Sequence, residues 1–273
     1  YEETIAEHSF ENLKKGVLNF INESNFKRFL MIIKSAGFIS PKLIRSKNAQ
    51  NSAYIVYLKL KELNVNSVNI ESYVKRWFVF SILTGRYSGS PESIFDYDIK
   101  QISHKPFDEY LEEKEEGELS DAFWSAALPR NFDTSVASSP YFHVFLASQV
   151  KANDKGFLSK DVTIGDLIKL RGDIHHLFPK DYLKKHGLDM QSEINIKIGN
   201  KPPKEYLDMV INQNAPNNRV LSGLSTHEGL LDNLSSNCIP EEIQNMEIED
   251  YPVFLERRRI LMSQKIRDYY FSL

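Results

Sequence analysis

The stretch IESYVKRWFVFSIL, residues 70–83, decides the fold class of this chain. Val74, Trp77 and Phe78 recur at the three- and four-residue intervals that place side chains on one face of an α-helix. Similar spacing occurs in residues 48–63, in residues 140–150 and from residue 250 to the end of the chain. We therefore expect a mainly α protein built as a multi-helix scaffold.

Local signals give several helix boundaries. Ser24 is expected to cap a helix that stops at Gly37, and Pro91 is expected in the first turn of a helix that follows a loop. The acidic run at residues 109–118 predicts an exposed helix face or a mobile segment rather than a site.

Composition narrows the functional class. The 273 residues include 34 Lys and Arg against 37 Asp and Glu, a net charge of −3, which argues against a uniformly basic nucleic-acid binder. The apolar runs, such as residues 29–33, are all far too short to cross a bilayer, and the single Cys238 excludes a disulfide framework or a Cys-rich zinc site. We expect a cytoplasmic protein with no membrane contact. The start at Tyr1 rather than Met suggests a part of a longer chain.

One segment departs from the helical pattern. Between residues 160 and 204, histidine, proline, glycine and lysine are concentrated, and nine Lys and Arg oppose six Asp and Glu, a local charge of +3. Phosphate-binding regions carry this sign, although the excess is small.

The sequence GDIHHLFPK, residues 172–180, lies in this basic segment. On a strand, neighbouring side chains point to opposite faces, so one imidazole could bind a metal while the other faces a substrate water. Asn195, in a stretch of helical character that ends at Asn200, can supply an amide oxygen. A histidine and an amide oxygen, completed by water and phosphate, suit Mg²⁺ or a similar divalent ion better than a closed zinc site.

Each of these residues also has a plain structural interpretation. His175 and His176 could be surface histidines with no shared task, and Asn195 could cap a helix. Any single lysine of the segment could be an ordinary solvated side chain. The remaining histidines have no partner at ligand spacing and are expected to be structural: His8, His104, His143, His186 and His227.

A family resemblance favours the functional interpretation. His-His-x-x-Pro followed by a loop and an Asn-bearing helix resembles the HNH, or ββα-metal, nuclease finger. Together with the sequences LTGRYSGSPE at 83–92 and FLERRR at 254–259, it resembles the C-terminal half of GmrSD-like, modification-dependent type IV restriction and phage-defence proteins. The resemblance extends over essentially the whole chain. It implies a small ββα insertion in the helical scaffold and an N-terminal ParB-like domain in the full-length protein.

The resemblance also implies residue roles. His175 and Asn195 would be metal ligands, with side chains about 4–6 Å apart, and His176 the general base that activates water. The cofactor would be Mg²⁺ or Mn²⁺, and the partner would be DNA, possibly modified. Asp173 and Asn200 would support the ligands, and five lysines would contact phosphates: Lys180, Lys184, Lys185, Lys197 and Lys201.

The sequence departs from the family pattern at one point. HNH fingers carry an Asn in a loop before the final helix, but here Asp189 runs directly into Met190, and the second strand of the finger has no obvious sequence. Either the finger is shortened and inactive, or the protein has further residues at this point. We expect the second, because both flanks match the family.

These expectations give three segments: a helical scaffold at 1–158, the HNH finger at 159–210 and a C-terminal segment with a long helix at 211–273. The preferred function is a metal-dependent DNA endonuclease within a defence protein. The alternatives are a decayed helical DNA-binding or interaction module, and a regulatory module that gates an N-terminal nucleotide-hydrolysing domain.

Overall fold

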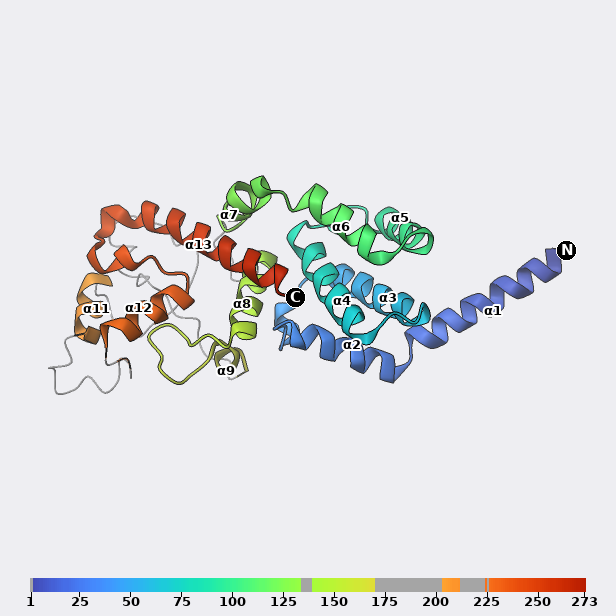
Figure 1. Ribbon diagram of the computed structural model, residues 1–273, viewed down its shortest axis with the longest axis horizontal. Coiled ribbons are helices and arrows are strands. Elements are labelled where there is room, and N and C mark those ends of the chain that lie inside the picture. Colours follow the sequence, from blue (N-terminus) through green and yellow to red (C-terminus); the bar gives the residue numbers. More distant parts are fainter. Residues whose placement is uncertain (1, 134–138, 170–202, 212–223, 225) are drawn as a thin grey trace. The chain divides into compact units, whose positions relative to one another are not determined.

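The computed structural model describes residues 2–133, 139–169, 203–211, 224 and 226–273 (Figure 1). These residues are mainly helical and contain no β-strand, with one antiparallel bridge between Lys155 and Thr163. The expected mainly α fold is therefore confirmed for this part. Of the expected ββα finger at 159–210, residues 170–202 lie outside the described part, and the described flanks form no strand. The chain divides into two compact units, one formed by residues up to Ala36 with Ser46–Gly117, the other by Gly37–Arg45 with residues from Glu118 to Ser272.

The first unit begins with two helices joined by a tight turn, and the helices that follow them build its core. Its elements are α1 (Glu2–Phe20), α2 (Glu23–Ser35), α3 (Lys47–Glu62), α4 (Ser67–Leu83), α5 (Pro91–His104) and α6 (Phe107–Glu118). Helices α3 and α4 pack against each other and confirm the helices expected at 48–63 and 70–83. Asn22, not Ser24, caps α2, because the extended Asn22 lets its side-chain oxygen accept a hydrogen bond from the Asn25 N–H over 3.0 Å.

Aromatic side chains fill the core of the first unit. Trp77, Phe78 and Phe80 of α4 are fully buried, and the Trp77 ring lies 5.7 Å from the rings of Phe107 and Tyr110. The apolar spacing within residues 70–83 therefore marks the face of α4 that packs most extensively.

A buried carboxylate links the helices of the first unit. Asp98 on α5 accepts hydrogen bonds from the guanidinium of Arg86, from the Tyr87 hydroxyl over 2.5 Å and from the Tyr110 hydroxyl over 2.6 Å. Tyr87 in turn contacts the Ser52 hydroxyl of α3 over 2.6 Å. Burial, followed by the neighbouring carboxylate, raises the pKa of both tyrosines, so these hydroxyls stay protonated donors. The cluster is a fully satisfied structural network.

The acidic run of α6 is exposed only in part. Glu109, Glu112 and Glu116 face solvent as expected, but Glu115 is buried and forms a two-pronged ion pair with Arg76 of α4. The expectation was wrong for Glu115, because a charge run in sequence does not reveal which member meets a partner from another helix.

The second unit is organised around the apolar helix α8 and the long helix α13. Its described elements are η1 (Pro41–Leu43), the π-helical η2 (Phe123–Ala127), α7 (Leu128–Asn131), α8 (Pro140–Ala152), α9 (Ile164–Lys169), α11 (Pro203–Ile211), α12 (His227–Ser236), η4 (Glu241–Asn245), η5 (Ile248–Asp250) and α13 (Tyr251–Phe271). Helix α8 is almost wholly buried, and α13 packs against it. The helices expected near 140–150 and after residue 250 are thereby confirmed.

Gly37 allows the early segment of the second unit to approach α8. Its φ of +98° is unfavourable for L-residues, and a Cβ at this position would lie 2.1 Å from the Ala147 carbonyl oxygen. Glycine is thus required both for backbone conformation and for space. Among the described residues, no helix is both long and apolar enough to cross a membrane.

Candidate functional site

All the predicted site residues lie in the span 170–202, outside the described residues. The structure therefore does not test whether the predicted ligands His175 and Asn195 lie close to each other or to the predicted base His176. It does not test the Asp189–Met190 junction either. The same holds for Asp173, Asn200 and the five lysines: Lys180, Lys184, Lys185, Lys197 and Lys201. Among the residues that are described, no group of three or more His, Cys, Asp or Glu side chains is placed to hold a metal ion.

What the structure does describe is the framework on either side of this span. Helix α9 ends at Lys169, directly before it, and α11 begins at Pro203, directly after it. Both helices belong to the second unit. The segment that carries the HNH-like motif is thus attached at both ends to the same compact unit.

The entry helix α9 has a reciprocal cap. The Asp166 carboxylate accepts hydrogen bonds from the Thr163 N–H over 3.1 Å and from the Thr163 hydroxyl over 2.6 Å, and the Asp166 N–H donates to the hydroxyl oxygen over 3.0 Å. These hydrogen bonds lower the pKa of Asp166. The cap fixes where α9 starts, although the helix has only six residues.

The loop that leads into α9 is held by one buried amide. Asn233 of α12 accepts a hydrogen bond from the Leu158 N–H over 2.8 Å and donates to the Gly156 carbonyl over 3.1 Å and to the Ser159 carbonyl over 3.4 Å. Leu158 itself has a φ of +56°, an uncommon conformation for a branched residue. Several contacts from one side chain keep the loop in this conformation.

An ion pair fixes the start of the same loop. The Lys265 ammonium of α13 lies 2.6 Å from the Asp154 carboxylate and donates to the Ser236 carbonyl at the end of α12 over 3.0 Å. Burial raises the pKa of Asp154, against the opposing effect of Lys265. Lys265 therefore ties together the loop, the C-terminus of α12 and the long α13.

The exit helix α11 is anchored on an apolar cluster. Leu207 is 1% exposed and packs in a cluster that includes residues of α12, η4 and α13. At the surface, Lys204 pairs with Glu247 over 3.0 Å. The cluster has these buried members: Phe157, Leu158, Leu207, Leu230, Leu234, Ile239, Ile243, Met246, Tyr251 and Phe254. Since Phe157 and Leu158 come from the entry loop, one cluster anchors both sides of the span.

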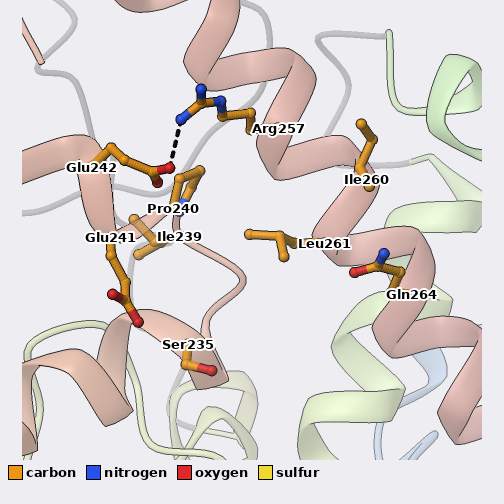
Figure 2. A pocket seen from close by; sticks show the side chains of 9 residues that line it. All are labelled: Ser235, Ile239, Pro240, Glu241, Glu242, Arg257, Ile260, Leu261 and Gln264. Atoms are coloured by element: carbon orange, nitrogen blue, oxygen red, sulfur yellow. Dashed lines mark hydrogen bonds and ion pairs between the residues drawn. The ribbon is translucent and has the colours of Figure 1, made fainter.

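The arginine cluster of α13 forms part of this framework. Arg257 pairs with Glu242 over 2.6 Å, Arg259 pairs with Asp133 over 2.7 Å, and Arg258 is buried. Arg257 and Glu242 border a groove of about 570 Å³ between α13 and η4, which Figure 2 shows. The lining of the groove is mixed, with Ile239, Pro240 and Leu261 beside polar and charged side chains, and its arginine is already neutralised by a carboxylate.

Sequence reasoning did not identify Asn233, Asp154 or Lys265. Asn233 sits at a buried position of an amphipathic helix, and an isolated Asn there carries no motif. The aspartate and lysine lie more than a hundred residues apart, so their pairing depends on the tertiary fold.

No protein-family model, no curated protein and no solved structure matches the chain.

Proposed function

We propose that this chain is a metal-dependent DNA endonuclease of the HNH type, the effector part of a bacterial restriction or anti-phage defence protein. The observation that carries the proposal is the sequence GDIHHLFPK at residues 172–180, followed by Asn195. A histidine pair at this spacing before a proline, with a later Asn, combines a proton acceptor with donors for a divalent cation.

The donor chemistry fits Mg²⁺ or Mn²⁺. One imidazole from His175 and one amide oxygen from Asn195 would leave coordination positions for water and phosphate oxygens. When bound, such an ion would offset the negative charge that develops on the phosphate and on the leaving oxygen. Asp173 and Asn200 would restrict the orientation of these two ligands.

His176 would act as the general base. A neutral imidazole can take the proton of the attacking water because its pKa lies close to the working pH. Lys180, Lys184 and Lys185, with Lys197 and Lys201, would hold the DNA through its phosphates, a contact that depends on salt but not on sequence.

The described framework provides attachment points for the proposed finger. A finger of this length buries little apolar surface of its own, so it depends on the stability of its attachment points. The capped α9, the Asn233 hydrogen bonds and the burial of Leu207 provide such points. In the full-length protein, an N-terminal ParB-like domain would supply nucleotide-dependent control, and the site of action would be the cytoplasm.

Plasmid nicking in Mg²⁺ or Mn²⁺ tests the proposal. His176→Ala is expected to abolish cleavage, whereas His104→Ala, an exposed histidine on α5, serves as the matched control and is expected to cleave like the parent chain. Circular dichroism and thermal unfolding establish that both variants are folded. Wild-type cleavage by a folded His176→Ala chain would refute the assigned base.

A decayed module is the second candidate, and the missing Asn between Asp189 and Met190 favours it. That chain would bind DNA, or gate the nucleotide-hydrolysing domain, without cutting. Cleavage assays on the present sequence and on a version with an Asn-bearing loop inserted after Asp189 separate the two. Cleavage restored by the insertion would identify a nuclease that needs the loop, and inactivity of both versions together with retained DNA binding would identify the module.

A further inference from the structure

The first unit has an apolar stripe on α1 that its own helices leave uncovered. Phe10, Leu13 and Val17 are 63%, 65% and 48% exposed, and Ile21, just past the end of the helix, is 66% exposed. Their spacing of three and four residues lines them up along one side of the helix. Large side chains exposed in such a row are uncommon on a monomer surface and mark an interaction site.

The contacts of α1 with its own unit come mainly from elsewhere on the helix. Lys15, which projects nearly opposite the stripe, pairs with Glu62 of α3 over 3.1 Å. Near the end of the helix, Phe20 contacts Tyr54 at a ring distance of 5.2 Å. In Figure 1, the N-terminal part of α1 extends away from α2, α3 and α4. The stripe therefore stays available to a partner.

Gly16 gives an independent indication. A glycine inside a helix costs about 1 kcal/mol relative to alanine. A Cβ at Gly16 would meet no atom within 4 Å, so the described part of the chain gives no packing reason for the glycine. The position lies beside the stripe, where the absence of a side chain allows another backbone to approach closely.

We propose that α1 pairs with α1 of a second copy of this chain, antiparallel, in a symmetric dimer. The charges beside the stripe select this occupant. Glu11 and Lys14 lie along the same edge of the stripe. In an antiparallel pair, Phe10 can lie across from the partner's Leu13. Each Lys14 then faces the partner's Glu11. Symmetry forms this attractive pair twice. In a parallel pair, the edge with Glu11 and Lys14 would face the other edge of the partner's stripe. That edge carries Ser9 and Gly16, which have no charge.

The apolar area that the pair can bury is small. In this register the two stripes overlap around Phe10 and Leu13, and burying the exposed parts of Phe10, Leu13 and Val17 on both copies removes roughly 600 Å² of apolar surface. That lies below the range of permanent dimers and matches transient interfaces. We therefore expect a weak dimer that forms reversibly. The inference concerns assembly and holds whether or not the proposed nuclease is correct.

Sedimentation velocity of the whole chain from about 1 to 100 µM tests the dimer. We expect a concentration-dependent dimer that Leu13→Glu weakens at least tenfold. Val68→Glu, which places the same charge at a 73% exposed apolar position of α4, should leave it unchanged. A parent chain that stays monomeric at the highest concentration would assign the stripe to another occupant and overturn the proposal, as would a Leu13→Glu chain that dimerises normally.

Charge reversal tests the antiparallel orientation. Lys14→Glu alone and Glu11→Lys alone each create repulsion across the dimer axis and should weaken it. Mixing the two variants should restore association at least tenfold over either alone, because each new charge then faces its opposite. Within one helix, Lys14 and Glu11 also form an ion pair over 3.5 Å, and mixing the variants cannot restore that pair. A mixture that associates no more tightly than either variant alone would therefore overturn the antiparallel arrangement.

Discussion

The side chain of Asn233 accepts a hydrogen bond from the backbone N–H of Leu158 over 2.8 Å, across 75 residues of sequence. This contact stabilises a leucine in a left-handed conformation at the loop before α9. The position of one amide thus affects the attachment of the whole HNH-like segment to the second unit.

Removing this amide should destabilise the protein. Asn233→Ala leaves the Leu158 N–H without its buried acceptor and removes one of the two donors to the Gly156 carbonyl, and we expect a loss of about 2–3 kcal/mol in the free energy of unfolding. Urea denaturation followed by circular dichroism measures it. Asn12→Ala, at an exposed position of α1, is the control and should change stability by no more than about 0.5 kcal/mol. Equal effects of the two changes would contradict the structural role of Asn233.

Replacing the buried Asp98 of the first unit should lower the free energy of unfolding more than Asn233→Ala does. Asp98→Asn removes the charge that balances the Arg86 guanidinium inside the unit, and we expect a loss of about 3–5 kcal/mol. Asp96→Asn, two residues away on α5, breaks only an exposed pair with Lys100 and should cost less than about 0.5 kcal/mol. Chemical denaturation of both variants makes the comparison, and a small effect at Asp98 would show that its network is dispensable.

Replacing Gly37 and Gly117 by alanine should change the stability of the protein in opposite directions. Gly37→Ala forces a Cβ against the Ala147 carbonyl at a positive φ, so we expect destabilisation by more than about 2 kcal/mol. Gly117→Ala adds a methyl group to helix α6 where nothing lies within 4 Å, and we expect a gain of up to about 1 kcal/mol. Thermal unfolding distinguishes the two, and a stabilised Gly37→Ala chain would contradict the close approach to α8.

The single thiol should be unreactive in the folded chain. Burial raises the pKa of Cys238 to about 11, so at pH 8 the reactive thiolate is scarce and also covered. We expect labelling by a disulfide reagent to be at least about tenfold slower than in the urea-unfolded chain. Only Cys238 can react, and Cys238→Ala supplies the blank.

The raised pKa of Cys238 also makes the stability of the protein depend on pH. The folded pKa lies above the ordinary thiol value of 9.0, so ionisation favours the unfolded chain at high pH. The stability contributed by the neutral thiol is complete below about pH 9 and is lost as the pH rises toward 11. Denaturation midpoints across this range should therefore fall less steeply in Cys238→Ala than in the parent chain.

The sequence predicts the helices well because their signal is local. The spacing of Val74, Trp77 and Phe78 reports the buried face of α4 directly, and Pro91 marks the first turn of α5. The α2 cap was misplaced by two residues, since Asn22 and Ser24 are both good caps and only the backbone geometry distinguishes them.

The supporting contacts were not predictable. Arg76–Glu115, Asp154–Lys265 and Asn233–Leu158 each join residues far apart in sequence, and none of these residue types is rare. The proposed chemistry of His175 and His176 stays a prediction, because its evidence is a sequence motif whose residues lie outside the described part of the chain.

The short piece Gly37–Arg45 belongs to the second unit although the chain on both sides of it builds the first. During synthesis this piece leaves the ribosome well before α8, against which its η1 turn packs. At about 5–20 residues per second, the delay amounts to several seconds. The first unit can therefore fold before α8, against which this piece packs, has been made. Consequently, the second unit cannot be produced as a fragment that begins at residue 118 without losing part of its core.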